Sequence, residues 1–451
     1  MPQERSRLIS FKKRVGTFEE VRLGLSQAEA IENARIFLER ERAVKGQGCP
    51  LTADIFPILK LLAQKDVRGA ALKLFEADPL AAVTSRLAPE FFNETQVYNR
   101  KAARISLRAI QRFLADRFSG TRPIDAAGIS RKAKVAVIGS GPVGLMTALF
   151  LGREGYAVTV FESSSFPGGS LAAFYPEFRL PAAVVNAVLT RCAAEGVEFK
   201  LNVLFPRTIS ADELFDEGGF SAVLLAAGAS VPERLGIAGE DAAGVISASK
   251  MLFLARAMRA GREPYTTPVF IGGKVVVAGH DEMAFDAART ALRMGAAVTM
   301  VINGAETDIR VSGDLVREAA EEGVKFKTFS APVSVKSEAG CAKALVCRHL
   351  DYRVDDAGRL TVVEHSDAEF ELAADTIIVS HGTRANTKFL SEIPGLDLNL
   401  DGSVWLKPDS SYTSVRKIFA AGHVTRPGAS LLEVLIDARR AASEITAYLN
   451  G

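Results

Sequence analysis

The chain has 451 residues, roughly two to three times the usual domain size, which excludes a peptide hormone, a toxin or a single small binding module. Hydrophobic residues make up 48% of the sequence and charged residues 24%, a composition typical of a folded globular protein. The 55 lysines and arginines nearly balance the 53 acidic residues, so the net charge of +2 indicates neither a nucleic-acid partner nor a membrane surface.

The cysteines and the amino-terminal sequence bear on the compartment. Cys49, Cys192, Cys341 and Cys347 do not have the spacing of a disulfide framework, which favours a reducing compartment. No run reaches about 18 apolar residues, and the first residues lack the apolar core of a signal peptide. We therefore expect a soluble, cytoplasmic protein.

The first quarter of the chain has a helical pattern. Residues 17–118 are rich in helix formers, with apolar side chains at three- and four-residue spacing, and Ser26 stands where a helix cap is expected. A polar stretch with glycine and proline follows at 119–134 and is typical of a linker. We expect a helical amino-terminal domain over residues 1–128.

The rest of the chain contains the same supersecondary pattern twice. An apolar strand at 134–139, a glycine turn, a helix and a second strand at 157–162 form one βαβ unit. The same order returns with strands at 274–279 and 297–302. This predicts an α/β fold with two Rossmann-like dinucleotide-binding domains rather than a solenoid, whose period would be far shorter.

The first glycine turn, GSGPVG, has every part of a dinucleotide-binding fingerprint. Gly139 permits a tight turn, Gly141 lets a pyrophosphate approach the backbone, and Gly144 lets the helix pack on the strand. Glu162 closes the next strand, where a carboxylate accepts hydrogen bonds from an adenosine ribose. The alternative is an empty Rossmann-like domain whose glycines serve packing only.

Three further segments resemble one flavoprotein family. The segments FPGGSLAAFYPEFRLP (166–181), AVLLAAGAS (222–230) and TSVRKIFAAGHV (413–424) are similar to those of the glutamate synthase small (beta) subunit and its relatives. The resemblance implies FAD in the first dinucleotide domain and NADPH in the second, which is inserted into the first. It places the FAD domain at 129–262 and 375–451, and the NAD(P)-binding-like domain at 263–374.

The same resemblance assigns FAD contacts one position at a time. They are Gly139, Ser140, Gly141, Pro142, Gly144, Glu162, Gly169, Leu171, Arg179, Val203, Ala227, Gly228, Gly422 and His423. Gly169, Leu171 and Ala227 have an alternative interpretation as turn and core residues. At His423 the family has an aspartate near the flavin ribityl chain, and a histidine can also bond a hydroxyl group.

The second glycine turn departs from the family pattern. GHDEMA has Asp281 where the family has its second glycine, and Glu282 follows it. A carboxylate there would obstruct and repel a pyrophosphate. Asn303 and Gly304 stand where the family has a pair of arginines for the 2′-phosphate. We expect NADPH and NADH to bind weakly or not at all.

The cysteines of the family's helical domain are also largely missing. Carrying the family spacing over leaves Cys49 in place, and the other positions become Phe37, Arg40, Lys45, Ala88, Phe92 and Gln96. A [4Fe–4S] centre takes four thiolates, so we expect no iron–sulfur cluster and no other metal site.

Two functions follow from these patterns. The first is an FAD-binding oxidoreductase that passes electrons between the flavin and a partner subunit or a nicotinamide cofactor. The alternative is a non-catalytic pseudoenzyme that acts as an assembly or regulatory subunit. The intact GSGPVG turn with Glu162 favours the first, whereas Asp281, Asn303, His423 and the missing cysteines favour the second.

Overall fold

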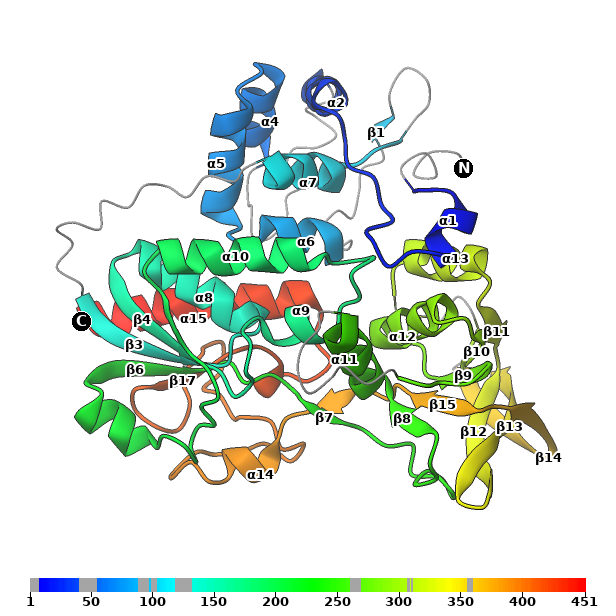
Figure 1. The fold of residues 1–451 in the computed structure, drawn as a ribbon. Helices are drawn as coiled ribbons and strands as arrows, with labels where there is room; N and C mark the ends of the chain where they lie inside the picture. Colours follow the sequence, from blue (N-terminus) through cyan, green and yellow to red (C-terminus); the bar gives the residue numbers. More distant parts are fainter. Residues whose placement is uncertain are drawn as a thin grey trace.

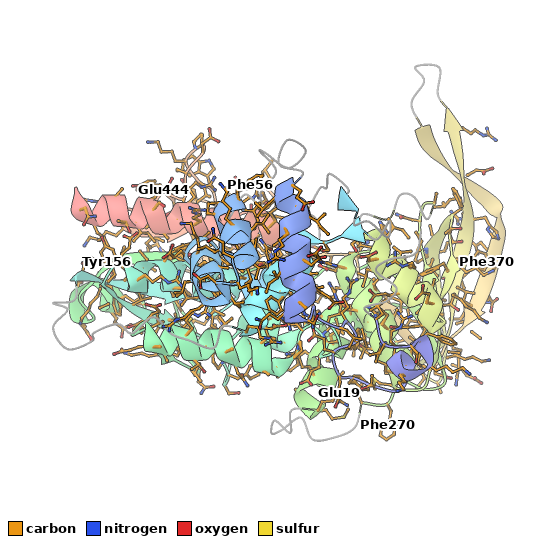
Figure 2. The ribbon with its side chains drawn as sticks, turned by 90° about the horizontal axis from the view of Figure 1, so that it is seen from above. Glu19, Phe56, Tyr156, Phe270, Phe370 and Glu444 are labelled. Atoms are coloured by element: carbon orange, nitrogen blue, oxygen red, sulfur yellow. The ribbon has the colours of Figure 1, made fainter. Side chains whose placement is uncertain are left out.

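The computed structural model describes residues 8–39, 55–87, 97–98, 104–117, 132–259, 269–305, 309, 311–354 and 360–451. Figure 1 shows a group of helices at the top, a parallel sheet with its helices on the left, and a second sheet on the right. Figure 2 places Tyr156 and Glu444 at one end of the molecule and Phe370 at the other. The predicted architecture of a helical amino-terminal domain with two Rossmann-like domains is confirmed.

The amino-terminal domain is a set of short helices, most of which share one apolar core. Its elements are α1 (Phe11–Val15), α2 (Gln27–Glu39), α4 (Phe56–Ala63), α5 (Val67–Ala77), α6 (Ala81–Leu87), α7 (Leu107–Arg117), β1 (Val97–Tyr98) and β2 (Arg104–Ile105). Leu62, Leu74 and Phe113 are buried in the core. The Asp66 carboxylate begins α5 by accepting a hydrogen bond from the Gly69 N–H at 2.8 Å, so this helix has the side-chain cap that its first turn requires.

The first Rossmann-like domain is a parallel sheet in the order β17-β6-β3-β4-β5. Its strands are β3 (Lys132–Ile138), β4 (Tyr156–Phe161), β5 (Glu198–Lys200), β6 (Phe220–Leu225) and β17 (Ile418–Ala420). Its helices are α8 (Pro142–Arg153), α9 (Gly169–Ala173), α10 (Ala182–Ala194), α14 (Thr387–Leu390) and α15 (Leu431–Asn450), with a π-helical turn at Glu213–Glu217 and a 3-10 turn at Gly422–Val424. Because β17 pairs with β6, the chain returns to this sheet after the second domain.

The second Rossmann-like domain is a parallel sheet in the order β11-β10-β9-β15-β8. Its strands are β8 (Val245–Ser247), β9 (Lys274–Ala278), β10 (Ala297–Val301), β11 (Lys325–Lys327) and β15 (Thr376–Val379), and its helices are α11 (Ala248–Arg259), α12 (Glu282–Arg293) and α13 (Gly313–Glu322). An antiparallel sheet extends from it, formed by β12 (Ser330–Glu338), β13 (Cys341–Val354) and β14 (Leu360–Ala373).

The two chain segments that connect the Rossmann-like domains pair with each other. They form the antiparallel strands β7 (Val231–Pro232) and β16 (Thr383–Arg384). Strand β8 pairs with β15, and β15 pairs with β9, so β8 and β15 both belong to the second sheet. The residue limits predicted from the sequence instead place β8 and β15 in the FAD domain. We propose limits for the inserted domain near residues 243 and 382, because these include every strand of its sheet.

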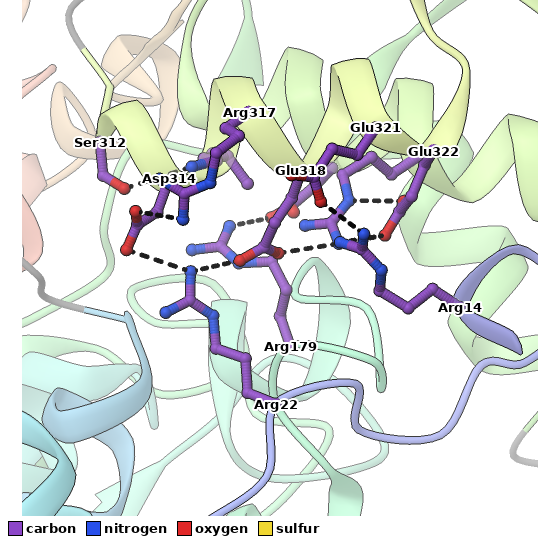
Figure 3. A network of polar contacts seen from close by, with 12 residues as sticks. Arg14, Arg22, Arg179, Ser312, Asp314, Arg317, Glu318, Glu321 and Glu322 are labelled. Atoms are coloured by element: carbon purple, nitrogen blue, oxygen red, sulfur yellow. Dashed lines mark hydrogen bonds and ion pairs between the residues drawn. The ribbon is translucent and has the colours of Figure 1, made fainter. Parts of the chain in front are cut away.

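Charged side chains fill the junction between the amino-terminal segment and the second domain (Figure 3). Glu322 of α13 accepts hydrogen bonds from Arg289 Nη2 and Arg293 Nη1 of α12, each at 2.7 Å, and Arg14 Nη1 of α1 lies 3.8 Å from Glu322 Oε1. Burial opposes ionisation of Glu322, but the bonds from both α12 arginines outweigh it and lower its pKa to about 2. Both of these arginines also lie over the ring of Phe178 from the first domain. Buried paired charges therefore join the amino-terminal segment to the second domain, and the two α12 arginines reach the first domain through the ring of Phe178.

Candidate functional site

The first glycine turn follows β3 and opens α8, as predicted. Gly139 has a φ of +106°, and a Cβ there would lie 2.6 Å from the Ala226 carbonyl oxygen. A Cβ on Gly144 would lie 2.0 Å from the Gly139 carbonyl oxygen, so this glycine serves helix packing. Gly141 is the N-cap of α8, and a Cβ there would meet no heavy atom within 4 Å in the described part of the chain. The space beside Gly141 is what an approaching phosphate requires.

Glu162 stands at the end of β4 and ties this turn to the neighbouring strand. Its Oε2 accepts hydrogen bonds from the Ser140 N–H at 3.0 Å and the Ser140 hydroxyl at 2.5 Å, and its Oε1 accepts one from the Ser164 N–H at 2.8 Å. The Gly168 N–H in turn donates to the Ser140 hydroxyl at 2.9 Å. The carboxylate therefore holds the glycine turn in shape as well as facing the cavity beside it.

A cavity of about 530 Å³ lies between the two Rossmann-like domains. This size is within the range of small-molecule and cofactor sites. Ten of the predicted FAD positions line it, namely Gly139, Ser140, Gly141, Pro142, Glu162, Gly169, Val203, Ala227, Gly228 and His423. Residues of the second glycine turn line the same cavity, namely Asp281, Glu282 and Met283. One cavity therefore brings both glycine turns together.

Among the described residues, four predicted positions are not part of that lining. Gly144 packs on the turn, and Leu171 is fully buried in the first domain's core. Gly422 has a φ of +82°, and a Cβ there would lie 2.6 Å from a Val143 methyl group, so it permits close packing on α8. Arg179 instead faces α12 of the second domain.

His423 lies in the 3-10 turn before α15. Its Nε2 is 2.7 Å from the Ala429 carbonyl oxygen, so Nε2 carries the hydrogen in that contact. Ser430 then caps α15 together with Glu433 in a capping box. His423 thus fixes the loop that brings the amino terminus of α15 to the cavity, because Ser430 and Leu431 also line it.

The second glycine turn has the same backbone shape as the first, but a different residue type caps the helix that follows it. Gly279 has a φ of +143°, and a Cβ there would lie 2.1 Å from the Ser380 carbonyl oxygen. Asp281 is the N-cap of α12, and its Oδ1 accepts hydrogen bonds from the Ala284 N–H and the Ser380 hydroxyl, both at 2.7 Å. The Asp281 carboxylate is therefore already hydrogen-bonded by two donors of the protein.

The two further acids of α12 share one arginine from the first domain. Arg179 Nη2 lies 2.6 Å from Glu282 Oε1, and Arg179 Nη1 lies 2.5 Å from Asp286 Oδ2. Burial lowers the pKa of Arg179, but Asp286 and Glu282 outweigh it and the net direction is upward, so the guanidinium stays charged. Burial raises the pKa of Asp286 to about 6, with Arg179 acting in the opposite direction.

Sequence reasoning missed Asp286 and two aromatic residues of the cavity. Asp286 follows Glu282 by one helical turn, so the four-residue spacing of two acids after a glycine turn is the signal that could have found it. Phe166 and Phe253 line the cavity and stack with ring centroids 6.3 Å apart. They come from different domains, and no sequence spacing connects them.

Residues 133–443 match the family described as pyridine nucleotide-disulphide oxidoreductase. The chain is 29% identical to the glutamate synthase [NADPH] small chain of Escherichia coli over 89% of this chain and 87% of that protein. It is also 29% identical to the NADP(+)-dependent formate dehydrogenase subunit beta of Moorella thermoacetica, over 89% of this chain and 59% of the relative's length. The resemblance drawn from the sequence is confirmed.

Solved structures show the same fold at low identity. FprA of Mycobacterium tuberculosis in complex with NADPH superimposes with a TM-score of 0.57 at 18% identity, covering 71% of this chain and 85% of that one. Thioredoxin reductase of T. acidophilum gives a TM-score of 0.51 at 16% identity, covering 71% of this chain and all of that one. These likenesses establish the fold of the two Rossmann-like domains.

Residues 14–122 match the family described as "Dihydroprymidine dehydrogenase domain II, 4Fe-4S cluster". This match contradicts the prediction of no iron–sulfur cluster, which rested on cysteine positions carried over by spacing. Phe37 is described and lies buried in the helical core, where it offers no thiolate. Cys49 is the one cysteine of the matched segment, whereas a [4Fe–4S] centre takes four thiolates. Cys49 and the positions Arg40, Lys45, Ala88, Phe92 and Gln96 lie outside the described residues.

The prediction of weak nicotinamide binding is contradicted as well, because the matched family is described by pyridine nucleotides and two relatives have NADP(+) or NADPH in their names. The physical reason is visible at α12. The prediction treated the two acids of the turn as free charges, whereas Asp281 is engaged in capping and Glu282 is paired with Arg179.

Two absences hold among the described residues, one of metal-ligating groups and one of membrane-spanning helices. In that part of the chain, no group of three or more His, Cys, Asp and Glu side chains could hold a metal ion. None of the helices described there is both long and apolar enough to cross a membrane.

Proposed function

The chain belongs to the pyridine nucleotide-disulphide oxidoreductase family, and from this premise we propose that it is an FAD-dependent oxidoreductase that exchanges electrons with NADP(H) and with a partner subunit. The observation that carries the proposal is the single cavity lined by both glycine turns. An electron donor and an electron acceptor held by separate Rossmann-like domains have to meet, and a shared cavity provides the meeting place. The pseudoenzyme alternative is not supported.

The residues of the first turn suit the adenosine diphosphate part of FAD. Gly141 leaves the first turn of α8 without a side-chain cap, so its amide groups and helix dipole are available to a pyrophosphate. Glu162 offers acceptors to a ribose at the end of β4. When bound, the flavin supplies two-electron chemistry, and the protein's part is to hold and orient it.

The second turn is the proposed place for NADP(H). The relatives from E. coli and M. thermoacetica have NADPH or NADP(+) in their names. Arg179 neutralises one carboxylate of α12 from outside the second domain, which reduces the repulsion of an incoming phosphate. Asp281 would rotate away from the Ala284 N–H to make room for that phosphate.

A partner subunit is proposed because both of these relatives are subunits by name. The chain spans 59% of the length of the Moorella protein. Reconstitution tests the cofactor assignment. Protein incubated with excess FAD and desalted should retain flavin absorbance, and Gly141→Asp should abolish it by adding a side chain and a negative charge at the helix terminus.

Gly313 supplies the matched control for that experiment. It begins α13, and a Cβ there also meets no heavy atom within 4 Å among the described residues. Gly313 is absent from the described lining of the cavity. Gly313→Asp should therefore leave flavin retention unchanged. Equal loss of flavin in both variants, or retention in Gly141→Asp, would contradict the assignment.

A further inference from the structure

The amino-terminal segment Leu8–Arg22 closes on itself and lies against the second domain. The Ile9 N–H donates to the Val21 carbonyl oxygen at 3.1 Å, and Leu8 forms a β-bridge with Arg22, so the two ends of the segment lie side by side. Helix α1 lies between these ends, and Figure 1 shows it beside α13. We call this segment the strap.

Two arginines of the strap pair with acids of α13 (Figure 3). Arg22 Nη2 lies 2.5 Å from Glu318 Oε1 and 3.7 Å from Asp314 Oδ2. Arg14 Nη2 lies 2.6 Å from Glu321 Oε2, and the Arg14 side chain is only 3% exposed. Asp314 and Glu321 are about two helical turns apart, so the two arginines fix the direction of α13 as well as its position.

Other strap residues contact the remaining two helices of the second domain. The Thr17 carbonyl oxygen accepts a hydrogen bond from Arg293 Nε of α12 at 2.9 Å. The guanidinium of Arg259, at the end of α11, lies 4.1 Å from the centroid of the Phe18 ring. Val15 packs against the apolar core of this domain. The strap therefore contacts α11, α12 and α13 at separate places.

The strap is attached to the other two domains through Glu20 and Val21. The Glu20 carboxylate accepts a hydrogen bond from Arg86 Nε of α6 at 2.8 Å and pairs with Arg112 of α7 at 2.9 Å. The Val21 N–H donates to the Phe178 carbonyl oxygen of the first domain at 3.2 Å. The Phe178 ring lies beneath two arginines of α12. The strap therefore holds the same point of the first domain that the second domain contacts directly.

The covalent connection between the two Rossmann-like domains is narrow by comparison. Its two chain segments pair as the two-residue strands β7 and β16, and the Glu233 N–H donates to the Gly382 carbonyl oxygen at 3.0 Å. Short connections of this kind are where one domain rotates on another. Rotation of the second domain there would separate the two glycine turns that line one cavity. The direct contacts of Arg179 with α12 oppose this rotation, and so do the contacts of the strap.

We propose that the strap holds the second domain in the orientation in which both glycine turns face one cavity, so that Arg14 and Arg22 are positioning residues for electron exchange between NADP(H) and FAD. This inference rests on the proposed function. The strap is absent from the described lining of the cavity, so it acts through the placement of the domain. Rotation of the second domain would break the contacts with three helices together, which favours a single orientation over several.

The first test measures the orientation in protein without cofactor. Lys325 of β11 and Ser443 of α15 are exposed and belong to different Rossmann-like domains, so spin labels at these two positions report the distance between the domains. Pulsed electron paramagnetic resonance should give one narrow distance distribution. Two populations or one broad distribution in the protein with an unchanged strap would overturn the proposal, and this result does not depend on any strap variant.

The second test loosens the strap by combining Arg14→Gln with Arg22→Gln. The label distribution should broaden, because the pairs with α13 are lost. In protein loaded with FAD, anaerobic reduction of the flavin by NADPH should slow about 100-fold, which is the effect that a small misplacement of reacting groups produces. An unchanged distribution or an unchanged rate would overturn the proposal. If this double variant does not fold, Arg22→Gln alone, at a side chain that is 28% exposed, is measured in the same way.

Arg207→Gln combined with Arg440→Gln is the matched control. These changes also remove two arginines, but the pairs that they break, with Glu392 and Asp437, lie inside the first domain. The control should keep the narrow distribution and the rate of the parent. Equal effects in both double variants would overturn the role given to the strap.

The two tests separate this inference from the proposed function. Failure of the parent protein to retain FAD, or of NADPH to reduce it, would contradict the proposed function. The label distances are measured without cofactor, so they decide whether the strap holds the second domain even in that case.

Discussion

The two glycine turns occupy the same position in their domains but begin their helices differently. Gly141 caps α8 without a side chain, whereas Asp281 caps α12 with a carboxylate that bonds the Ala284 N–H and the Ser380 hydroxyl. The backbone shape is retained in both, with positive φ at Gly139 and at Gly279. The comparison teaches that the βαβ frame fixes where an anion could bind, while the cap and its neighbours determine the charge that it meets.

The helices that follow these two turns also differ in the charge of the residues that they bury. The α8 helix is buried through apolar residues such as Leu145, Met146 and Leu149. The α12 helix buries Arg289, and it depends on acids of α13 to balance the charge. The second domain is therefore expected to be more sensitive to loss of a single charge than the first.

The largest effect is expected from Glu322→Gln. This change leaves Arg289 and Arg293 buried with one balancing charge fewer, and breaking such a buried pair costs about 3–5 kcal/mol of unfolding free energy. Denaturant unfolding of both proteins would measure it. Glu392→Gln removes an exposed pair with Arg207 and should leave the unfolding midpoint almost unchanged. Equal shifts in both variants would contradict the role given to Glu322.

Glu322 also gives this prediction a dependence on pH. Its folded pKa of about 2 lies below the ordinary value of 4.5, so its stabilisation is present above pH 4.5 and is lost as pH falls toward 2. Glu322→Gln should remove this part of the acid sensitivity. A variant that loses stability with acid as steeply as the parent would contradict the assignment.

A smaller effect on stability, with the opposite dependence on pH, is expected at Asp286. Its folded pKa of about 6 lies above 3.8, so its contribution to stability is greatest below pH 3.8 and is lost as pH rises through 6. The loss amounts to about 3 kcal/mol at most. Unfolding free energies measured at several pH values should show that Asp286→Asn removes it. An identical pH dependence in the variant and the parent would exclude this contribution.

The smallest effect concerns the cap that distinguishes the two turns. Asp281→Ala removes the acceptor for the Ala284 N–H and should cost about 1 kcal/mol of unfolding free energy. Asp281→Asn keeps an acceptor oxygen and should cost less. Thermal or denaturant unfolding distinguishes them, and an Asp281→Ala protein as stable as the parent would show that the cap contributes nothing.

Local patterns predicted the fold because strands, glycine turns and helices are encoded by neighbouring residues. The GSGPVG turn between β3 and α8 is of this kind, whereas the return of the chain at β17 is implied by the family resemblance. The contacts of Arg179 are of another kind. Its partners Glu282 and Asp286 lie more than a hundred residues away, and only the packing of one domain on the other brings them together. For the same reason the sequence alone does not show that Glu282 of the second turn is paired with Arg179.

The central claim is that both glycine turns serve one cavity, and anaerobic mixing of FAD-loaded protein with NADPH tests it most directly. The cavity predicts that NADPH alone, with no partner subunit present, bleaches the flavin absorbance of the bound cofactor. Protein that holds FAD and keeps its full flavin absorbance at saturating NADPH would contradict the claim.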